Sequence, residues 1–312
     1  MNRVLVTGGT GFVGSHVVRR LVRDGHEVHL LCREESNFWR IADVLGELRR
    51  HVGSLEDGEG LRGVVREARP EFVYHLGAAT LVAGAAPSAA HLVGVNLLGT
   101  VQLLQALEQV DYGGFVGTGD SFEYTPQRGR LVEDGVCHPD ALHGIAKLAA
   151  TLYGKAAAKA GNRPIVTLRL FSTYGGYDHP RRLVPKVIQG ALGGSPILLS
   201  RPDITRDWVY VDDVVDLYLR AAGEARRLAG SVLNAGSGVA TNLGEIVALI
   251  QRLTGGGGEV RWGVFPAPHH DDYPWVADPG AVEAALGWRP KVGLEEGMRA
   301  TIDYERGGGC GR

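Results

Sequence analysis

The stretch Val4-Leu5-Val6-Thr7-Gly8-Gly9-Thr10-Gly11-Phe12-Val13-Gly14 stands near the start of the chain and decides the fold. Its first three residues form a short apolar run, which is typical of a buried parallel strand, and apolar residues recur at helical spacing after Gly11. Gly8, Gly11 and Gly14 separate these two patterns. In a dinucleotide-binding turn, such glycines allow the tight turn, the approach of a pyrophosphate and close packing of helix on strand. The stretch therefore predicts a strand, a phosphate-binding turn and a helix whose first amides and dipole hold the phosphates.

Glycine accounts for 46 of the 312 residues, so a glycine spacing of this kind can arise by chance. The residues around it must therefore support the interpretation. A glycine turn that binds no ligand is the alternative interpretation. The turn follows a predicted strand and opens a predicted helix at the extreme N-terminus, and this context favours the ligand-binding interpretation.

Length and composition agree with an enzyme of the cytoplasm. A chain of 312 residues, 44% of them hydrophobic, can form one sizeable α/β domain and a smaller lobe. A net charge of -2 provides no basic field for nucleic acid or for an anionic membrane. Three cysteines, Cys32, Cys137 and Cys310, have neither metal-type spacing nor an even disulfide framework, which favours a reducing compartment. We find no secretion signal and no apolar run of membrane-spanning length, so we expect no membrane partner.

The first half of the chain alternates short apolar runs with helical segments. This alternation predicts an α/β fold with a doubly wound parallel sheet. After the first strand, we expect strands at 27–32, 50–54, 72–76, 114–117 and 165–170, and a returning strand within 231–238.

Four motifs along the chain are shared with one family. They are T-G-x-x-G-x-x-G at 7–14, N-x-x-G-T at 96–100, R-D-W-V-Y-V-x-D at 206–213 and L-G-W-x-P at 286–290. With them, the chain resembles the extended short-chain dehydrogenase/reductases, and among these the NAD(P)-dependent nucleotide-sugar epimerases and dehydratases. The resemblance extends from the first strand to the last helix.

The resemblance implies a Rossmann domain with a smaller C-terminal α/β lobe that binds substrate. The Rossmann domain is expected over 1–174, with returning pieces around 206–235. The lobe is expected over 175–205 and 236–305, and a flexible tail over 306–312. The resemblance also implies a homodimer and a nucleotide-diphosphate sugar as partner.

The implied reaction is hydride exchange between a sugar carbon, usually C4, and a nicotinamide cofactor. Dehydration is disfavoured, because Phe122 occupies the position where dehydratases carry a catalytic Glu. An epimerase and an NADPH-dependent nucleotide 4-keto-sugar reductase both stay open. A third interpretation, of another class, is a catalytically degenerate protein that binds a nucleotide sugar or a dinucleotide.

The end of the second strand is expected to select the cofactor. NAD enzymes usually place a carboxylate there for the ribose hydroxyls, whereas this chain has Cys32-Arg33. A guanidinium suits a ribose 2′-phosphate, with Ser36 nearby as a further donor, so we expect NADP to be preferred over NAD. Alternatively, Arg33 is a solvated charge or stacks on the adenine. The expected cofactor-binding residues are Gly8, Gly11, Phe12, Val13, Gly14, Arg33, Ser36, Leu76, Gly77, Ala78, Lys147 and Phe171.

The catalytic motif departs from that of the family. The family has Y-G-x-S-K, with Tyr as acid/base and Lys on the nicotinamide ribose, whereas this chain has His143 in place of the Tyr and keeps Lys147. A helix brings positions i and i+4 to one face, so both side chains can face the cofactor, and imidazole can transfer protons near neutral pH. The catalytic hydroxyl of the family falls near Asp120 or Ser121, with Thr118 as a third candidate. We favour Ser121, because a carboxylate at Asp120 would repel a developing oxyanion.

Substrate-binding positions also follow from the resemblance. Arg206 is expected to hold the substrate pyrophosphate, or else to form an ion pair with Asp207 or Asp212. His269 or His270 stands in place of a second phosphate-binding Arg, and Ser172 stands in place of an Asn that contacts the phosphates. Thr80 completes the predicted substrate residues. We predict no metal site, because the adjacent side chains of His269 to Asp272 cannot all converge on one ion.

Overall fold

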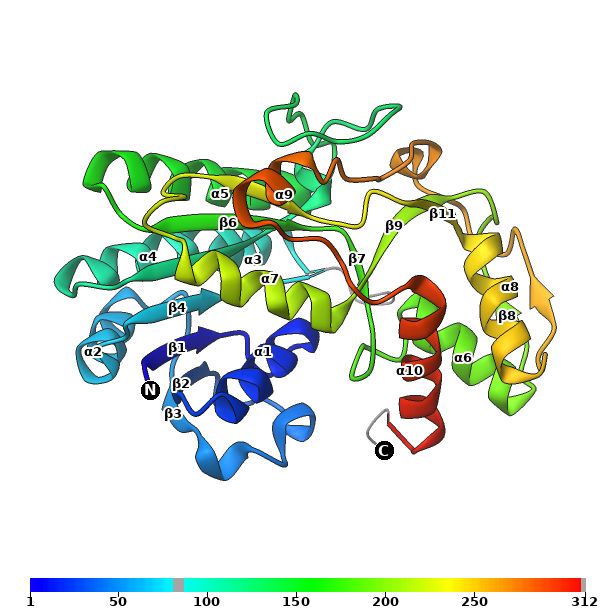
Figure 1. Cartoon of the computed structure of the whole chain (residues 1–312), viewed down its shortest axis with the longest axis horizontal. Helices are drawn as coiled ribbons and strands as arrows, with labels where there is room; N and C mark the ends of the chain where they lie inside the picture. The colour runs from blue at the N-terminus through cyan, green and yellow to red at the C-terminus, as the bar shows by residue number, and fades with distance from the viewer. Residues whose placement is uncertain (81–86, 310–312) are drawn as a thin grey trace.

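The large domain is built on one parallel seven-stranded sheet in the order β10-β6-β5-β4-β1-β2-β3. It is seen in a computed structural model that describes residues 1–80 and 87–309 (Figure 1). The predicted α/β fold with a doubly wound parallel sheet is therefore confirmed. The strands are β1 (Arg3–Thr7), β2 (Glu27–Cys32), β3 (Arg49–Val52), β4 (Phe72–His75), β5 (Gly114–Asp120), β6 (Ile165–Leu170) and β10 (Val232–Ala235).

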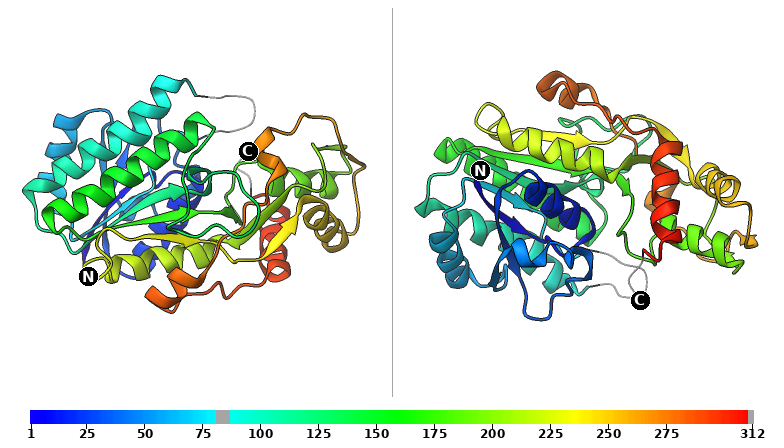
Figure 2. Two further views of the ribbon diagram at one scale, coloured as in Figure 1. Left: turned by 90° about the horizontal axis from the view of Figure 1, so that it is seen from above. Right: turned by 60° about the horizontal axis from the view of Figure 1, so that its bottom comes forward.

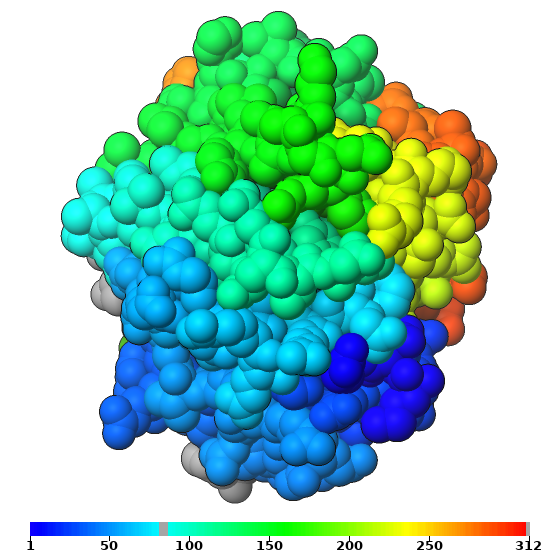
Figure 3. Space-filling view, turned by 90° about the vertical axis from the view of Figure 1, so that its left-hand side faces the viewer, coloured from blue at the N-terminus to red at the C-terminus, as the bar shows by residue number. Residues whose placement is uncertain are grey.

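Two helical layers cover the sheet because the strand residues alternate in direction. Val4 and Val6 join one hydrophobic core, and Leu5 between them joins another on the opposite face. The first core contains α1 (Phe12–Arg23) and α7 (Val211–Gly223), and the second contains α2 (Gly58–Ala68), α4 (Gly99–Ala106) and α5 (Leu142–Gly161). Figure 2 shows α4 and α5 side by side on their face. Figure 3 shows the end of the domain remote from the lobe, where segments of the first half of the chain pack together.

The smaller lobe lies beyond the carboxyl ends of the parallel strands (Figure 1). It contains a second sheet in the order β11-β9-β7 and a two-stranded β12-β8 pair. Helices α6, α8 and α10 pack around a separate hydrophobic core there. The bounds are β7 (Ser172–Tyr174), α6 (Leu183–Gly193), β8 (Ile197–Leu198), β9 (Thr205–Tyr210), β11 (Ala240–Asn242), α8 (Leu243–Thr254), β12 (Val260–Arg261) and α10 (Leu294–Arg306), with the short helix α9 (Gly280–Leu286) over the large sheet.

A continuous helical segment at 89–109 corrects one expectation. By length and composition alone it is apolar enough to cross a membrane, contrary to the prediction that no segment is. It comprises α3 (Ala89–Leu92), a π-helical stretch (Val93–Leu98), α4 and a 3₁₀ turn (Leu107–Gln109), and nearly half of its tested window is buried. Its apolar residues pack against α2, α5 and the sheet, so the composition follows from its place in the core.

The chain ends on α10, which reaches Arg306 inside the predicted tail of 306–312. The Gly307 amide donates to the Asp303 carbonyl oxygen at 3.1 Å, and the Gly309 amide donates to that of Tyr304 at 3.1 Å. The rest of that predicted tail, 310–312, lies outside the described residues.

Candidate functional site

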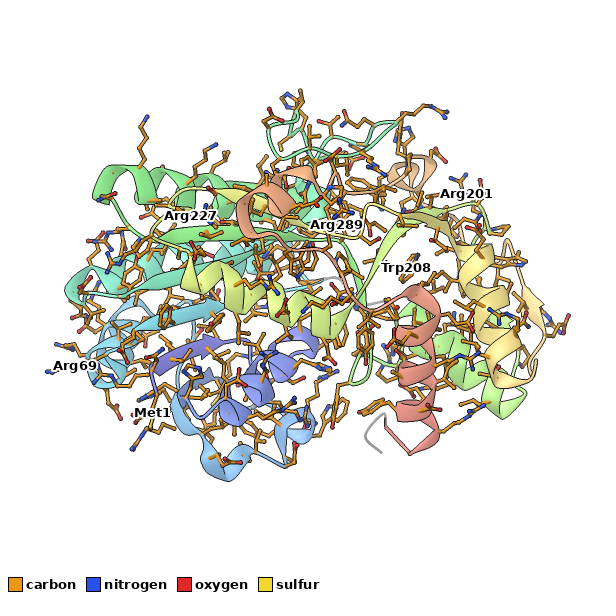
Figure 4. All side chains as sticks on the ribbon, in the orientation of Figure 1. Met1, Arg69, Arg201, Trp208, Arg227 and Arg289 are labelled. Atoms are coloured by element: carbon orange, nitrogen blue, oxygen red, sulfur yellow. The ribbon has the colours of Figure 1, made fainter. Side chains whose placement is uncertain are left out.

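A cavity of about 1070 Å³ opens at the carboxyl ends of the parallel strands, where the smaller lobe meets the sheet. Ligands of open α/β sheets bind in this place. Figure 4 shows Trp208 of β9 where the two parts of the molecule meet, and Trp208 is one of the lining residues. Every predicted site residue except His269 and His270 lines the cavity.

The glycine turn forms one wall of the cavity. Gly8 has φ +71°, and a Cβ there would lie 2.5 Å from the Gly77 amide nitrogen. A Cβ on Gly14 would lie 2.1 Å from the Gly8 carbonyl oxygen, and one on Gly11 would lie 3.2 Å from the same atom. The turn therefore packs backbone on backbone, and the first residues of α1, Phe12 and Val13, face the cavity. This geometry fits a bound dinucleotide, whose phosphates need close access to backbone amides.

The end of β4 supplies a second wall of small residues, including Gly77 and Ala78. His75 beneath them is fully enclosed, with Nδ1 2.7 Å from Thr7 Oγ1 and Nε2 2.9 Å from Thr100 Oγ1. Burial, and secondarily the charge of Lys147, lowers the pKa of His75 to about 3. His75 is therefore a neutral packed residue.

A buried asparagine fixes the chain just after that wall. Asn96 accepts a hydrogen bond from the Ala79 amide at 2.8 Å and donates one to the Ala79 carbonyl at 3.0 Å. The Asn of the N-x-x-G-T motif is thus a structural hydrogen-bonding residue. It holds the segment from which Thr80 lines the cavity.

The end of β2 carries charges of both signs. Arg33 lines the cavity, and its Nε lies 3.1 Å from Glu35 Oε1, with both side chains more than half exposed. The Arg33 amide donates to Ser36 Oγ at 2.9 Å, which orders the turn. A guanidinium therefore stands at the predicted place, with a carboxylate beside it that the sequence analysis did not consider.

His143 and Lys147 lie one turn apart on α5, and both side chains are buried against the cavity. Nε2 of His143 is 3.2 Å from Asp120 Oδ2, at the end of β5. Burial acts to raise the pKa of Asp120, but the hydrogen bond and charge of His143 outweigh it and hold that pKa below its usual value. Asp120 is therefore an ionised partner of the imidazole.

Lys147 is held at the same strand end, where its Nζ donates to the Thr118 carbonyl oxygen. Burial lowers the pKa of Lys147, and the nearby carboxylates of Asp120 and Glu123 oppose that effect. The buried Lys147 side chain thus has negative charge beside it where it lines the cavity.

The structure distinguishes the three candidates for the catalytic hydroxyl position near the end of β5, which are Thr118, Asp120 and Ser121. Thr118 Oγ1 donates to the His75 carbonyl oxygen at 2.8 Å and lies 2.6 Å from Tyr218 Oη, so its hydroxyl is engaged within the domain. Ser121 begins a 3₁₀ turn, η5 (Ser121–Glu123), and lines the cavity beside Asp120. Ser121 stays the candidate hydroxyl, and Asp120 is placed against His143.

Arg206 lines the cavity from β9 and has an ion-pair partner that the sequence analysis did not propose. Its Nη2 contacts Oδ1 of Asp271, and both side chains are largely buried. Asp207 instead accepts hydrogen bonds from Ser237, Gly238 and Ala277, and Asp212 lies 3.4 Å from Nδ1 of His16. An Arg206 pair with Asp207 or Asp212 is therefore wrong, because those carboxylates face other groups.

His269 and His270 are not brought to the cavity wall. They lie in the short 3₁₀ helix η6 (His269–Asp272), where His270 packs on Phe122 with ring centroids 5.1 Å apart and His269 packs on Tyr273 at 5.7 Å. The cationic residues that line the cavity near α6 are instead Arg181 and Arg182. Sequence reasoning missed them, although two adjacent arginines within the segment expected to form the lobe were a usable signal.

Four side chains of metal-ligating types follow one another in η6, His269–Asp272. Within 1–80 and 87–309, the structure has no group of three or more His, Cys, Asp or Glu side chains that could hold a metal ion.

Comparisons with known proteins identify the family. Residues 4–236 match the model of the NAD dependent epimerase/dehydratase family. UDP-glucose 4-epimerase of Mycolicibacterium smegmatis is 29% identical, with 97% of this chain and 98% of that protein covered. dTDP-glucose 4,6-dehydratase of Streptomyces niveus is 29% identical over 97% of this chain and 93% of its own length.

Solved structures agree with these relatives. UDP-glucose 4-epimerase of Thermotoga maritima with UDP-glucose has a TM-score of 0.89 at 28% identity, and 98% of this chain and 99% of that one are covered. The Thermus thermophilus enzyme in complex with NAD has a TM-score of 0.87 at 30% identity, with the same coverage. The replacement of a family Tyr by His143 stays an interpretation of the sequence. With its glycine turn, its parallel sheet and a family match over most of its length, the chain belongs to the NAD dependent epimerase/dehydratase family, within the extended short-chain dehydrogenase/reductases.

Proposed function

We propose that this protein modifies a nucleotide-diphosphate sugar by hydride transfer between a sugar carbon, C4 in our proposal, and a nicotinamide cofactor. The observation that carries the proposal is that the glycine turn and the His143–Lys147 face of α5 line one cavity. When bound, the dinucleotide supplies the hydride acceptor and donor. The relatives named above, epimerases and dehydratases of nucleotide sugars, support the same reaction class.

The residues of this chain supply binding and the proton. Gly8, Gly11 and Gly14 leave the phosphates access to the first amides of α1. His143 is the proposed carrier of the proton to or from the sugar hydroxyl. Its Nδ1 is buried without a hydrogen-bond partner among the described residues, so Nε2, which lies 3.2 Å from the ionised Asp120, is the nitrogen that would exchange the proton. Ser121 hydrogen-bonds the reacting sugar oxygen from the adjacent position.

Turnover tests this proposal against the alternative of a protein that only binds nucleotide sugars. Nicotinamide absorbance is followed with NAD and NADP over a panel of UDP- and dTDP-sugars and their 4-keto derivatives, and product sugars are identified by mass spectrometry. Epimerised or reduced product supports the proposal. Tight binding with no product from any sugar supports the binding protein.

Net reduction of a 4-keto sugar is the second candidate, and the Asp120–His143 contact favours it. In this contact the imidazole can hold a proton between Nε2 and the Asp120 carboxylate, and such a proton can be donated to a substrate oxygen. Reduction needs such a donor, whereas epimerisation needs both donation and abstraction.

A preference for NADP over NAD is part of the proposal, and it depends on Arg33. Arg33→Ala should lower NADP affinity by about 10- to 100-fold and leave NAD affinity nearly unchanged, because a charged hydrogen bond contributes about 1.5–3 kcal/mol. Titration calorimetry with both cofactors measures this. Glu35→Gln is the matched variant, since it removes the competing carboxylate and should raise NADP affinity. Equal affinities of the parent protein for the two cofactors would contradict the preference.

Binding of the substrate diphosphate by Arg206 is a further part of the proposal. Arg206→Leu should raise the KM for the nucleotide sugar by about 10-fold or more and leave cofactor affinity unchanged, because a charge-assisted hydrogen bond to phosphate is lost. Asp271→Asn separates the phosphate role from the ion pair, since it keeps the guanidinium and removes its partner. If both variants lower the melting temperature and weaken cofactor and sugar binding together, Arg206 is only a structural residue.

We also propose a homodimer formed through α5. Leu142, Ile145 and Leu152 are exposed apolar side chains on this helix at helical spacing, and Val93 and Leu98 are exposed on the neighbouring segment. A second copy of the chain would bury these residues.

We also propose that the protein is cytoplasmic, because its described cysteines are free thiols. Cys32 and Cys137 are free, and burial raises the pKa of both thiols. Such thiols keep their protons at neutral pH and suit a reducing compartment.

A further inference from the structure

Glu123 is a fully buried carboxylate immediately behind the Asp120–His143 contact. Its Oε1 accepts hydrogen bonds from the Asp120 amide at 2.9 Å and from Thr151 Oγ1 at 3.0 Å. Its Oε2 accepts one from Arg169 Nε at 2.8 Å. The carboxylate therefore joins the end of β5, helix α5 and strand β6, which meet at the catalytic corner.

The local sequence makes room for this group. Asp120 and Glu123 form a reciprocal capping box around the turn η5, since Asp120 Oδ1 accepts from the Phe122 amide at 2.9 Å. Gly119 on β5 leaves the necessary space, because a Cβ there would lie 2.7 Å from Glu123 Oε1. A buried charge is costly unless it is paired, and Arg169 provides the pairing.

The two acceptor bonds of Oε1 lead to the two elements that carry the proton site. One reaches the backbone of Asp120 itself, and the other reaches Thr151 on the helix that bears His143 and Lys147. Burial lowers the pKa of Lys147. The negative charge of Glu123, together with that of Asp120, opposes this lowering. A buried carboxylate needs such acceptor bonds in any case, and here they go to the two elements that carry the proton site.

We propose that Glu123 is a positioning residue: its carboxylate fixes Asp120 and helix α5 relative to each other, and so sets the contact between Asp120 and His143. The role in catalysis rests on the proposed function, whereas the role in placing the imidazole does not. Glu123 acts through Asp120 and Thr151 and touches no substrate.

The test removes the acceptor without leaving a buried unpaired charge. Glu123→Gln with Arg169→Met is the reference, because it abolishes the ion pair and keeps an oxygen at Oε1. Glu123→Leu with Arg169→Met removes that oxygen as well. Thr151→Val, with Thr151→Ser as its conservative counterpart, cuts only the bond to α5. Glu133→Gln is the control, since Glu133 is another carboxylate of this region, and it accepts from the Asn234 amide at 2.8 Å.

Two readouts are measured on the NAD-loaded protein. The first is the ¹⁵N signal of the His143 imidazole against pH, assigned by its absence in His143→Phe. The second is kcat and KM with the nucleotide sugar that the wild-type protein turns over. A merely structural role would change stability without moving the imidazole titration of a folded variant.

We expect the His143 imidazole to titrate differently in Thr151→Val than in the wild-type protein. We also expect it to titrate differently in the Leu/Met variant, Glu123→Leu with Arg169→Met, than in the Gln/Met reference, Glu123→Gln with Arg169→Met. Their kcat should fall about 10- to 100-fold with an unchanged KM, because small misplacements of reacting groups are costly. Thr151→Ser should restore both readouts. A His143 titration that Thr151→Val and the Leu/Met variant leave unchanged overturns the inference, and Thr151→Val decides alone if the Leu/Met variant does not fold. If the wild-type protein turns over no nucleotide sugar, the proposed function fails, and the imidazole titration still decides on Glu123.

Discussion

His143→Phe is expected to lower turnover of the true nucleotide sugar by ~10² to 10⁴-fold, because general acid/base catalysis contributes about that much. Phenylalanine roughly preserves the ring that fills the space between α5 and Asp120, but it cannot carry a proton. Cofactor affinity should change little, whereas the melting temperature should fall because Asp120 loses its partner. Steady-state kinetics, cofactor titration and thermal unfolding of the same preparation measure the three quantities.

The pH dependence of the wild-type protein gives the direction of proton transfer. The contact with His143 helps to hold the pKa of Asp120 below its usual value despite burial, so Asp120 stays ionised near neutral pH and is not the group that changes charge there. If abstraction limits the rate, activity falls on acidification, since the base becomes protonated. If donation limits it, as in net reduction, activity falls as pH rises.

His138→Phe is the matched control for this substitution, because His138 is an exposed histidine outside the cavity lining. It should leave kcat and the pH profile unchanged. Normal turnover by His143→Phe would show that His143 is only a packed helix residue and that water or another side chain carries the proton.

Gly14→Ala is expected to destabilise the fold by ~3 kcal/mol and to weaken cofactor binding, because overpacking against fixed backbone is costly. The added Cβ would lie 2.1 Å from the Gly8 carbonyl oxygen and 2.9 Å from Gly9 Cα, and backbone atoms cannot rotate away. If the turn shifts to relieve the contact, the phosphate-binding amides move with it. Cofactor affinity then falls about tenfold for each 1.4 kcal/mol of binding energy lost.

Gly63→Ala is the matched control for the glycine substitution. Gly63 lies inside α2, and a Cβ there meets nothing within 4 Å. Alanine is the better helix former by roughly 1 kcal/mol, so this variant should be as stable as the parent or more stable. Denaturant unfolding and cofactor titration compare the two variants. If Gly14→Ala unfolds like Gly63→Ala and binds NAD normally, the close packing of the turn has no energetic importance.

The fold could be predicted because its signals are local. The apolar run of β1, the glycine spacing and the alternation of later segments each fix one element, and the strand ends then meet at one edge of the sheet. Strand β5 was predicted to end at Gly117 and continues to Asp120, since Gly119 and the polar residues beside it obscure the strand pattern. The cap of α8, where the Asn242 side chain accepts a hydrogen bond from the Glu245 amide at 2.9 Å, is a local signal of the same kind.

The parts of the site that depend on distant pairs could not be predicted. Asp120 and His143 are 23 residues apart, and Arg206 and Asp271 are 65 apart. No spacing rule connects such positions, because their contact depends on how β5 meets α5 and how η6 folds over β9. The sequence identified His143 and Arg206 as candidates, but only the packing of these elements gave their partners.

The contact between Asp120 and His143 ties two positions of the chain to each other's chemistry. An ionised carboxylate only accepts hydrogen bonds, whereas a phenol both donates and accepts them. A tyrosine at 143 would therefore have to direct its proton at Asp120, and a hydroxyl at 120 would leave the imidazole without its anion. The chemical identities of the two positions are therefore coupled through this contact.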